Sequence, residues 1–377
     1  MYFVEKLKTP NPYKRFDFIL FIAVLVLSAI GLVVLSSAVK DRPNLLKSQI
    51  MALLMGIALC LVLSAIDYKD LKVLSLFIFF GAMGLMGITL LFGHGESLGN
   101  KNWINLAGMS VQPSEFAKIA YIILASVFLE RIKDNQEKNK KDIIKFIIYS
   151  CIAIGFVLLQ KDLGTALVFA FIFLCFIYIA GIPYRFIFIL CGAITLSLPF
   201  IWVYVLNDKR RERILTFISP ERDPQGGGYH VMMSKMAIGS GQLLGQGYGS
   251  GIQTQSHSVP VNESDFIFSV VGEELGFIGG MIIILLGLFI ILRCIHIAKN
   301  SSDSYGSFLV IGVTAMLSFN FIENIGMGIG LLPVTGLPLP FVSQGGTAIM
   351  AYYIAIGLVL SVSLRSKRNG LNSTQPI

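Results

Sequence analysis

A series of apolar stretches, each about 20 residues long, limits the fold of this chain more than any other feature. A helix needs ~20 mostly apolar residues to cross the ~30 Å hydrocarbon core of a bilayer. Only 14% of the 377 residues are charged, whereas a soluble protein carries roughly a quarter. We therefore predict an all-α integral membrane protein, a single polytopic domain with about ten transmembrane helices. The expected spans are 17–37, 46–66, 72–92, 114–131, 143–160, 164–181, 185–205, 265–292, 305–325 and 346–364.

The basic residues predict which side each loop occupies, because short cytoplasmic loops are enriched in Lys and Arg. With a cytoplasmic N-terminus, 18 of the 30 Lys and Arg residues lie on the inside, six lie in the long loop 206–264, and six remain on the external side. We therefore expect both termini in the cytoplasm and external loops at 93–113, 206–264 and 326–345. Irregular backbone at membrane depth must be buried in protein or line a wet cavity. Three such loops, partly re-entrant, predict a shared site on the outer face.

Ionisable residues at membrane depth are costly and therefore mark candidate functional sites. Glu115 and Lys118 are three residues apart at the start of the fourth span and share a helix face. A structural ion pair, helix capping with Ser114 and a substrate contact are the alternatives for this pair. Asp162 lies in the turn before the sixth span, where it either caps the helix or contacts substrate.

Asp265 gives the strongest signal, because it lies where an external loop enters the membrane beside several aromatic residues. Partial loss of water makes a carboxylate a better base. The alternative is that Ser264 or Asp265 caps the helix that follows. We expect one of Glu273 and Glu274, further along the same span, to face a polar interior and the other to begin a network with Lys118.

Two further loop features concern substrate binding. Arg210 and Arg213 belong to a basic cluster in the long external loop, and clustered guanidinium groups suit phosphate or pyrophosphate. Attraction to anionic lipid headgroups is the alternative. The segment 324–347 contains six glycines and three prolines and is almost uncharged, which favours a re-entrant segment packed against protein. The four histidines and five cysteines show no metal-ligand spacing, so no metal site is predicted from them.

Four motifs follow one another along the chain. They are QPSEFAK at 112–118, KDLGTA at 161–166, SDFIFSVVGEELG at 264–276 and NIGMGIGLLPVTGLPLPFVSQGG at 324–346. In this order and spacing they resemble the SEDS membrane proteins of bacteria, which act in shape, elongation, division and sporulation. The resemblance spans Arg15 to Arg365. Pro338 and the short termini resemble the RodA branch more than the FtsW branch, where threonine is usual at Pro338.

The resemblance implies a SEDS-type fold and an inverting peptidoglycan glycosyltransferase. Such an enzyme polymerises lipid II into β-1,4 glycan at the outer face of the cytoplasmic membrane during cell elongation and releases undecaprenyl pyrophosphate. The family's essential aspartate corresponds to Asp265, with an implied role as general base. The implied substrate-binding residues are Glu115, Lys118, Asp162, Arg210, Arg213 and Ser343.

The resemblance also implies ligands and partners. We expect a divalent cation, Mg²⁺ or Mn²⁺, and no organic cofactor. The expected partners are lipid II, membrane lipids and a class B penicillin-binding protein that cross-links the new strand, with no role for nucleic acid. Four positions depart from the family pattern: Asn102 for arginine, Val261 and Glu263 for glutamate and histidine, and Gln344 for tyrosine.

Two other functions remain open from the sequence. A flippase for the same lipid-linked precursor needs a polar path through both leaflets, whereas the motifs here gather on one side. A scaffold that recruits wall-synthesis proteins needs no carboxylates at membrane depth.

Overall fold

The computed structural model describes residues 16–95, 102–106, 109–134, 140–181 and 227–366, together with Gly192 and Arg211. These ranges are helical apart from one short hairpin and the connecting loops. The elements are α1 (Phe18–Ala38), α2 (Pro43–Ala65), α3 (Tyr68–Phe92), β1 (Ile104–Leu106), β2 (Met109–Val111), α4 (Pro113–Asp134), α5 (Lys140–Leu159), α6 (Leu163–Ile179), α9 (Gly227–Ser240), α10 (Ile252–Gln255), α11 (Ile267–Glu274), α12 (Gly276–Lys299), α13 (Ser304–Gly328) and α14 (Gly346–Leu364).

Seven of the described helices are long and apolar enough to cross a membrane: α1, α2, α3, α5, α12, α13 and α14. The 22-residue α4 and the 17-residue α6 run beside them. This confirms an all-α membrane fold. The number of spans agrees only approximately with the expected ten or so. The expected span 185–205 lies outside the described residues except for Gly192.

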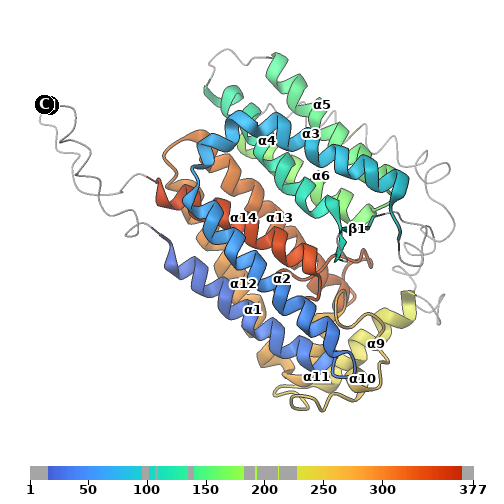
Figure 1. Cartoon of the computed structure of the whole chain (residues 1–377). Coiled ribbons are helices and arrows are strands. Elements are labelled where there is room, and N and C mark those ends of the chain that lie inside the picture. Colours follow the sequence, from blue (N-terminus) through green and yellow to red (C-terminus); the bar gives the residue numbers. More distant parts are fainter. Residues whose placement is uncertain are drawn as a thin grey trace, which may run out of the picture.

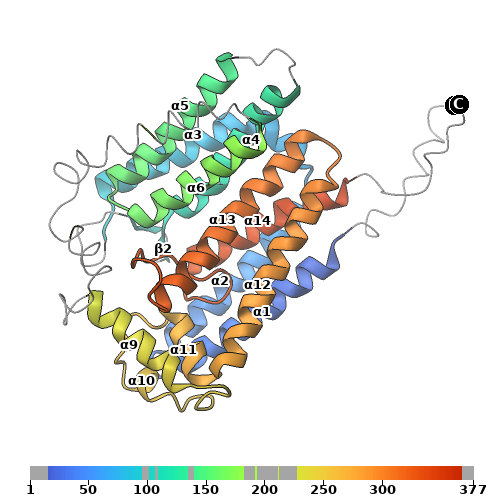
Figure 2. The same cartoon turned by 180° about the vertical axis from the view of Figure 1, so that it is seen from behind.

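The helices form two groups that pack along their length (Figures 1 and 2). One group contains α3, α4, α5 and α6, and the other contains α1, α2, α12, α13 and α14. Small residues let α2 and α14 approach closely. A Cβ at Gly357 would lie 2.8 Å from Cys60 O, and one at Gly56 would lie 3.2 Å from Tyr353 Cβ.

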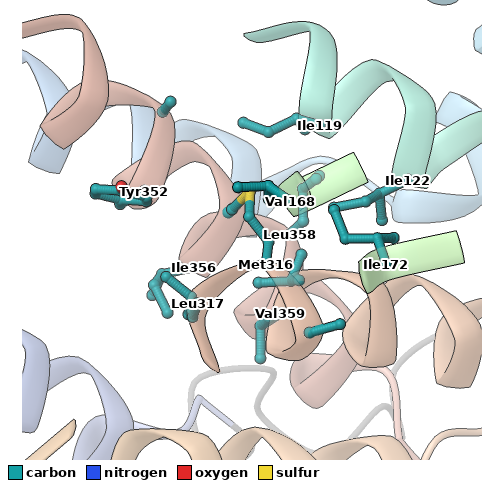
Figure 3. Packing of buried hydrophobic residues seen from close by; sticks show 14 of the residues in the cluster. Ile119, Ile122, Val168, Ile172, Met316, Leu317, Tyr352, Ile356, Leu358 and Val359 are labelled. Atoms are coloured by element: carbon teal, nitrogen blue, oxygen red, sulfur yellow. The ribbon is translucent and has the colours of Figure 1, made fainter. Parts of the chain in front are cut away.

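Buried apolar side chains join the two groups (Figure 3). Ile122 of α4, Ile172 of α6 and Met316 of α13 lie near the middle of their helices, and Val359 of α14 packs in the same cluster. All four are buried. The interior of the bundle at this level is therefore hydrophobic.

The described parts of the loops expected on the outer face meet at one end of the bundle. The hairpin β1–β2 and the helices α9, α10 and α11 lie there (Figures 1 and 2). Gln112 N donates to Thr347 Oγ1 at 3.3 Å, which joins the hairpin to the start of α14. Gln344 N donates to Glu263 O at 2.9 Å, which joins the last loop to the segment before α11.

The expected span 265–292 is not one continuous helix. The structure breaks it at Leu275 into the short α11 and the long α12. Gly276 adopts φ +67°, and a Cβ there would lie 2.3 Å from Gly245 N. The backbone of the preceding loop therefore packs directly against the break, where only glycine fits.

Glu273 and Glu274 hold this loop to the bundle. Glu273 Oε2 accepts from Thr254 N at 2.9 Å and Thr254 Oγ1 at 2.7 Å, and Glu273 Oε1 accepts from Gln253 N at 2.7 Å. Glu274 Oε1 accepts from Ser37 Oγ at 2.6 Å. These hydrogen bonds give both carboxylates a structural role. The expected network from one of them to Lys118 does not occur among the contacts of the described residues.

The last loop packs in the protein interior only in its second half, 337–343, which agrees with the prediction for that part of 324–347, whereas Leu331 is 69% exposed. Leu337, Leu339 and Phe341 are buried. A Cβ at Gly31 of α1 would lie 2.6 Å from Val342 Cα. This irregular segment therefore lies against helices, which satisfies the requirement for irregular backbone in a membrane protein.

Candidate active site

Asp265 lies in an irregular segment immediately before α11. The helix begins at Ile267 with Phe266 as its N-cap residue and no side-chain cap hydrogen bond. Neither Ser264 nor Asp265 is therefore the N-cap residue of this helix. Ser264 Oγ donates to Asp265 Oδ1 at 3.1 Å. A Cβ at Gly336 would lie 3.2 Å from Asp265 Oδ2, so the last loop lies beside the carboxylate.

Ser343 holds the segment before the aspartate. Its buried hydroxyl donates to Ser264 O at 2.6 Å and accepts from Leu339 N at 2.8 Å. The next residue, Gln344, donates its main-chain N–H to Glu263 O. The Ser343 hydroxyl therefore makes two hydrogen bonds within the protein, and a substrate contact by Ser343 stays a prediction.

Asn324 of α13 is a site residue that the sequence analysis does not predict. Its Nδ2 donates to Asp265 O at 2.8 Å and to Leu337 O at 2.8 Å. The side chain is fully buried. The signal that could have identified it is an amide in an apolar span, because polar groups at membrane depth are costly unless they bind a partner.

Glu323, the neighbour of Asn324, is a second buried polar residue outside the sequence predictions. Thr335 Oγ1 donates to Glu323 Oε1. Glu323 Oε2 has no hydrogen-bond partner among the described residues. Glu323 also lies close enough to Asp265 for their charges to interact. Two carboxylates therefore lie near each other at this end of the bundle.

Glu115 and Lys118 form an ion pair in the first two turns of α4. Lys118 Nζ lies 2.7 Å from Glu115 Oε1, and both side chains are buried. The structural alternative for this pair is therefore correct, and a substrate contact stays a prediction. Ser114 does not cap the helix, because α4 begins at Pro113 and Ser114 Oγ has no partner among the described residues.

Asp162 caps α6 and also gathers polar side chains around it. Its Oδ1 accepts from Thr165 N at 2.9 Å, so the capping alternative is correct. Its Oδ2 accepts from Thr165 Oγ1 at 2.9 Å, Asn102 Nδ2 at 3.1 Å and Gln112 Nε2 at 3.4 Å. Burial raises the pKa of Asp162, and the bonds from Thr165 and the charge of Lys118 offset part of this rise.

The last loop lies between Asp162 and Asp265. A Cβ at Gly164, two residues after Asp162, would lie 2.9 Å from Thr335 O. The next loop residue, Gly336, contacts Asp265 as described above. One short segment therefore touches the start of α6 on one side and the candidate base on the other. The structure brings Glu115, Lys118, Asp162 and Ser343 to the same end of the bundle as Asp265.

Two of the predicted phosphate-binding residues, Arg210 and Arg213, lie outside the described residues. Within the described ranges, no group of three or more His, Cys, Asp or Glu side chains could hold a metal ion.

Known proteins match this chain over almost its full length. A model of the FtsW, RodA and SpoVE family, described as cell cycle proteins, matches residues 16–368. The chain belongs to this family. The FtsW/RodA/SpoVE family is the SEDS family that the four motifs resemble, so that prediction is confirmed.

Named relatives of the FtsW/RodA/SpoVE family give the activity. The probable peptidoglycan glycosyltransferase FtsW of Geobacter metallireducens is 33% identical over 364 residues, which cover 94% of this chain and 96% of the relative. The peptidoglycan glycosyltransferase RodA of Treponema pallidum is 31% identical over 426 residues, covering 93% and 98%. This chain is therefore an enzyme, a peptidoglycan glycosyltransferase.

A solved structure has the same fold. It comes from a peptidoglycan synthase complex that coordinates polymerization and crosslinking, and it matches with a TM-score of 0.78 at 28% identity. The match covers 92% of this chain and 97% of the solved chain.

Three departures from the FtsW/RodA/SpoVE pattern have local partners. Asn102 donates to Asp162, as described above. Glu263 Oε1 accepts from Arg42 Nη1 at 2.8 Å, which ties the site segment to the turn between α1 and α2. Gln344 acts through its main-chain N–H and therefore needs no particular side chain for that bond.

Proposed function

We propose that this glycosyltransferase polymerises lipid II with Asp265 as general base. The carboxylate accepts the proton of the 4-hydroxyl of the acceptor N-acetylglucosamine. The hydroxyl oxygen attacks the anomeric carbon of the donor, the bond from that carbon to the pyrophosphate oxygen breaks, and undecaprenyl pyrophosphate leaves with the bonding electrons. Attack from the opposite face inverts the α-linked donor to a β-1,4 glycan.

The position of Asp265 is the observation that supports this proposal most. Asp265 lies outside the helix that follows it and beside Gly336 of the last loop. The chain that carries it belongs to a glycosyltransferase family. A positioned general base contributes typically 10²–10⁴-fold to a rate. The hydrophobic cluster in Figure 3 supports polymerisation over transport, because a flippase needs a polar path through both leaflets.

The polar groups around Asp162 and Lys118 supply a binding site for the lipid-linked substrates in this proposal. Lys118 is a cation that can offset the developing pyrophosphate charge, with Glu115 and Asp162 holding it and the neighbouring amides in place. Arg210 and Arg213 supply guanidinium groups that suit phosphate oxygens. Ser343 is part of the proposed substrate-binding site because it contacts the segment before Asp265.

A divalent cation, Mg²⁺ or Mn²⁺, remains part of the proposal. Asp265 and Glu323 are two nearby carboxylates, and Mg²⁺ in phosphate-binding enzymes is held by one or two carboxylates and the substrate phosphates. Such an ion would neutralise charge on the pyrophosphate. The donor set of the described residues fits this mode and not an all-protein cage.

The biological setting is a further proposal. We place the chain in the RodA branch, with a role in cell elongation, on the basis of Pro338. A class B penicillin-binding protein is the proposed partner, since the solved relative belongs to a complex that couples polymerization to crosslinking. The basic residues support cytoplasmic termini, which would put Asp265 at the outer face of the cytoplasmic membrane.

Glycan synthesis from labelled lipid II tests the proposed function. The purified chain with its cognate penicillin-binding partner is assayed in penicillin and moenomycin, which block cross-linking and conventional glycosyltransferases. We expect polymer from the wild type and at least about 10²-fold less from folded Asp265→Asn. Asp41→Asn, which changes an exposed carboxylate at the same end, is the matched control.

Two results would contradict the proposal. Equal polymerisation by wild type and Asp265→Asn would exclude this residue as the base. Failure of both to polymerise, together with movement of lipid II across liposome membranes, would favour the flippase.

A further inference from the structure

Three consecutive main-chain carbonyls around the candidate base are each held by a hydrogen bond. All three donors come from the last part of the chain, after residue 320. The donor and acceptor pairs are Gln344 N to Glu263 O, Ser343 Oγ to Ser264 O, and Asn324 Nδ2 to Asp265 O, at 2.9, 2.6 and 2.8 Å. This clamp holds a segment of turns that precedes α11, in which Ser264 N and Phe266 N donate to Val261 O at 3.2 and 3.3 Å.

Asn324 has the most specific position of the three donors. One nitrogen atom binds both the carbonyl of Asp265 and that of Leu337. Leu337 follows Gly336, which lies against the Asp265 carboxylate. The amide therefore fixes the base and its neighbouring loop relative to each other.

The helix that bears Asn324 provides a rigid support. α13 packs against α4, α6, α12 and α14, and most of its length is buried. A side chain on such a helix is held more firmly than one on a loop. The position of Asp265 thus depends on a helix that begins almost 40 residues later in the chain.

We propose that Asn324 is a positioning residue for the general base Asp265, and that Ser343 supports the preceding peptide in the same way. This inference rests on the proposed function. A displacement of about 1 Å at a reacting group can cost about 10²-fold in rate. Loss of the Asn324 amide would let the Asp265 peptide move while the substrate-binding side chains around Asp162 and Lys118 stay in place.

Steady-state polymerisation of labelled lipid II by the full chain with its partner tests the inference. We expect Asn324→Ala to lower kcat by about 10²-fold. KM should change by less than about threefold, because the residues that bind substrate are not those that position Asp265. The matched control is Asn320→Ala. Asn320 is a buried amide one turn earlier on α13 that donates to Tyr352 Oη at 3.0 Å and to none of the three carbonyls of the clamp. Tyr352 Oη donates in turn to Pro338 O at 3.4 Å, so this control changes support of the last loop and keeps all three donors of the clamp.

Wild type and Asp265→Asn, measured in the same assay, separate the two proposals. An active wild type, an inactive Asp265→Asn and an Asn324→Ala variant with wild-type kcat would overturn the positioning role alone. An equal loss of kcat in Asn324→Ala and Asn320→Ala would overturn it as well. An inactive wild type, or an active Asp265→Asn, would overturn the proposed function and the positioning role with it.

A second pair of variants decides the question if Asn324→Ala does not fold. Ser343→Ala removes the hydroxyl that binds Ser264 O, whereas Ser343→Thr keeps a hydroxyl. We expect Ser343→Ala to lower kcat by at least about tenfold with little change in KM, and Ser343→Thr to restore a large part of it. Equal kcat values for Ser343→Ala and the wild type would overturn the inference.

Discussion

Lys118 binds Glu115 at 2.7 Å with both side chains buried in α4. Removal of one partner leaves an uncompensated buried charge, which costs about 3–5 kcal/mol. We expect Lys118→Met or Glu115→Gln to lower the free energy of unfolding by about this amount, and the double variant to lose less than the sum. Denaturant unfolding in detergent measures all three.

Lys72→Met is the control for this prediction. Lys72 pairs with Glu130 at 2.5 Å, and both side chains are more exposed than Lys118 and Glu115, so its loss should lower the free energy of unfolding less than the loss of Lys118 does. A double variant of Glu115 and Lys118 that loses the full sum of the single effects would contradict a coupled pair.

Gly336→Ala should lower the rate of glycan synthesis in addition to the loss of stability that its backbone strain causes. Gly336 has φ +79°, and the added Cβ would lie 3.2 Å from Asp265 Oδ2. Gly330→Ala is a matched control, since Gly330 has φ +75° and its Cβ would instead meet the flexible side chain of Lys235 at 3.0 Å. Both should lose about 1–2 kcal/mol of stability. Only Gly336→Ala should lower kcat in glycan synthesis, and an equal loss in both would refute the contact.

Glu273→Ala should loosen the loop that precedes α11. The change leaves the main-chain N–H groups of Gln253 and Thr254 and the Thr254 hydroxyl without their acceptor. Each buried group left without a partner costs about 1–3 kcal/mol. We expect faster limited proteolysis between 241 and 258 and a lower unfolding temperature. Asp41→Ala, at an exposed carboxylate, should leave the cleavage rate unchanged.

Asp303 should contribute stability that disappears in acid. Burial alone would raise the pKa of Asp303, but hydrogen bonds from Tyr68 Oη at 2.6 Å and Gly306 N at 2.7 Å, with Lys69 Nζ at 3.2 Å, outweigh it and lower the pKa below the ordinary value of 3.8. The folded state therefore favours the ionised form. This contribution is present above pH ~4 and is lost as the pH falls through the folded pKa.

The unfolding temperatures of wild type and Asp303→Asn between pH 3 and pH 7 measure this effect. We expect the wild type to be more stable at pH 6 and the difference to shrink toward pH 3. A difference that stays constant over the whole range would contradict a lowered pKa at Asp303.

The helices were the most predictable part of the fold. The expected spans 305–325 and 346–364 agree with α13 and α14 to within a few residues. Hydrophobic length is a local property of the chain and needs no knowledge of neighbouring helices. The break at Leu275 was not predictable in the same way, because it depends on the approach of the Gly245 backbone to Gly276.

The sequence identified the charged residues of the candidate site but not the contacts that those residues make. Asp265, Asp162 and the pair in α4 are conspicuous as ionisable residues in or beside apolar spans. Asn324 was missed, since an amide at the start of a long motif has no evident partner until the loop 329–345 folds back. Glu323 was also missed, although it is an ionisable residue inside the expected span 305–325 and meets the same criterion. The alternatives for Glu115 and Asp162 also depended on which atoms lie within hydrogen-bonding distance.

The sequence alone determined that this chain is a multi-pass helical membrane protein of the SEDS family with Asp265 as its candidate base. Those properties follow from apolar length and from motifs that are contiguous in the chain. Only the tertiary structure showed that Asn324, Ser343 and Gln344 hold the three carbonyls at 263–265. Hydrogen bonds between segments about 60 to 80 residues apart arise from helix packing, and no local pattern of residues encodes them.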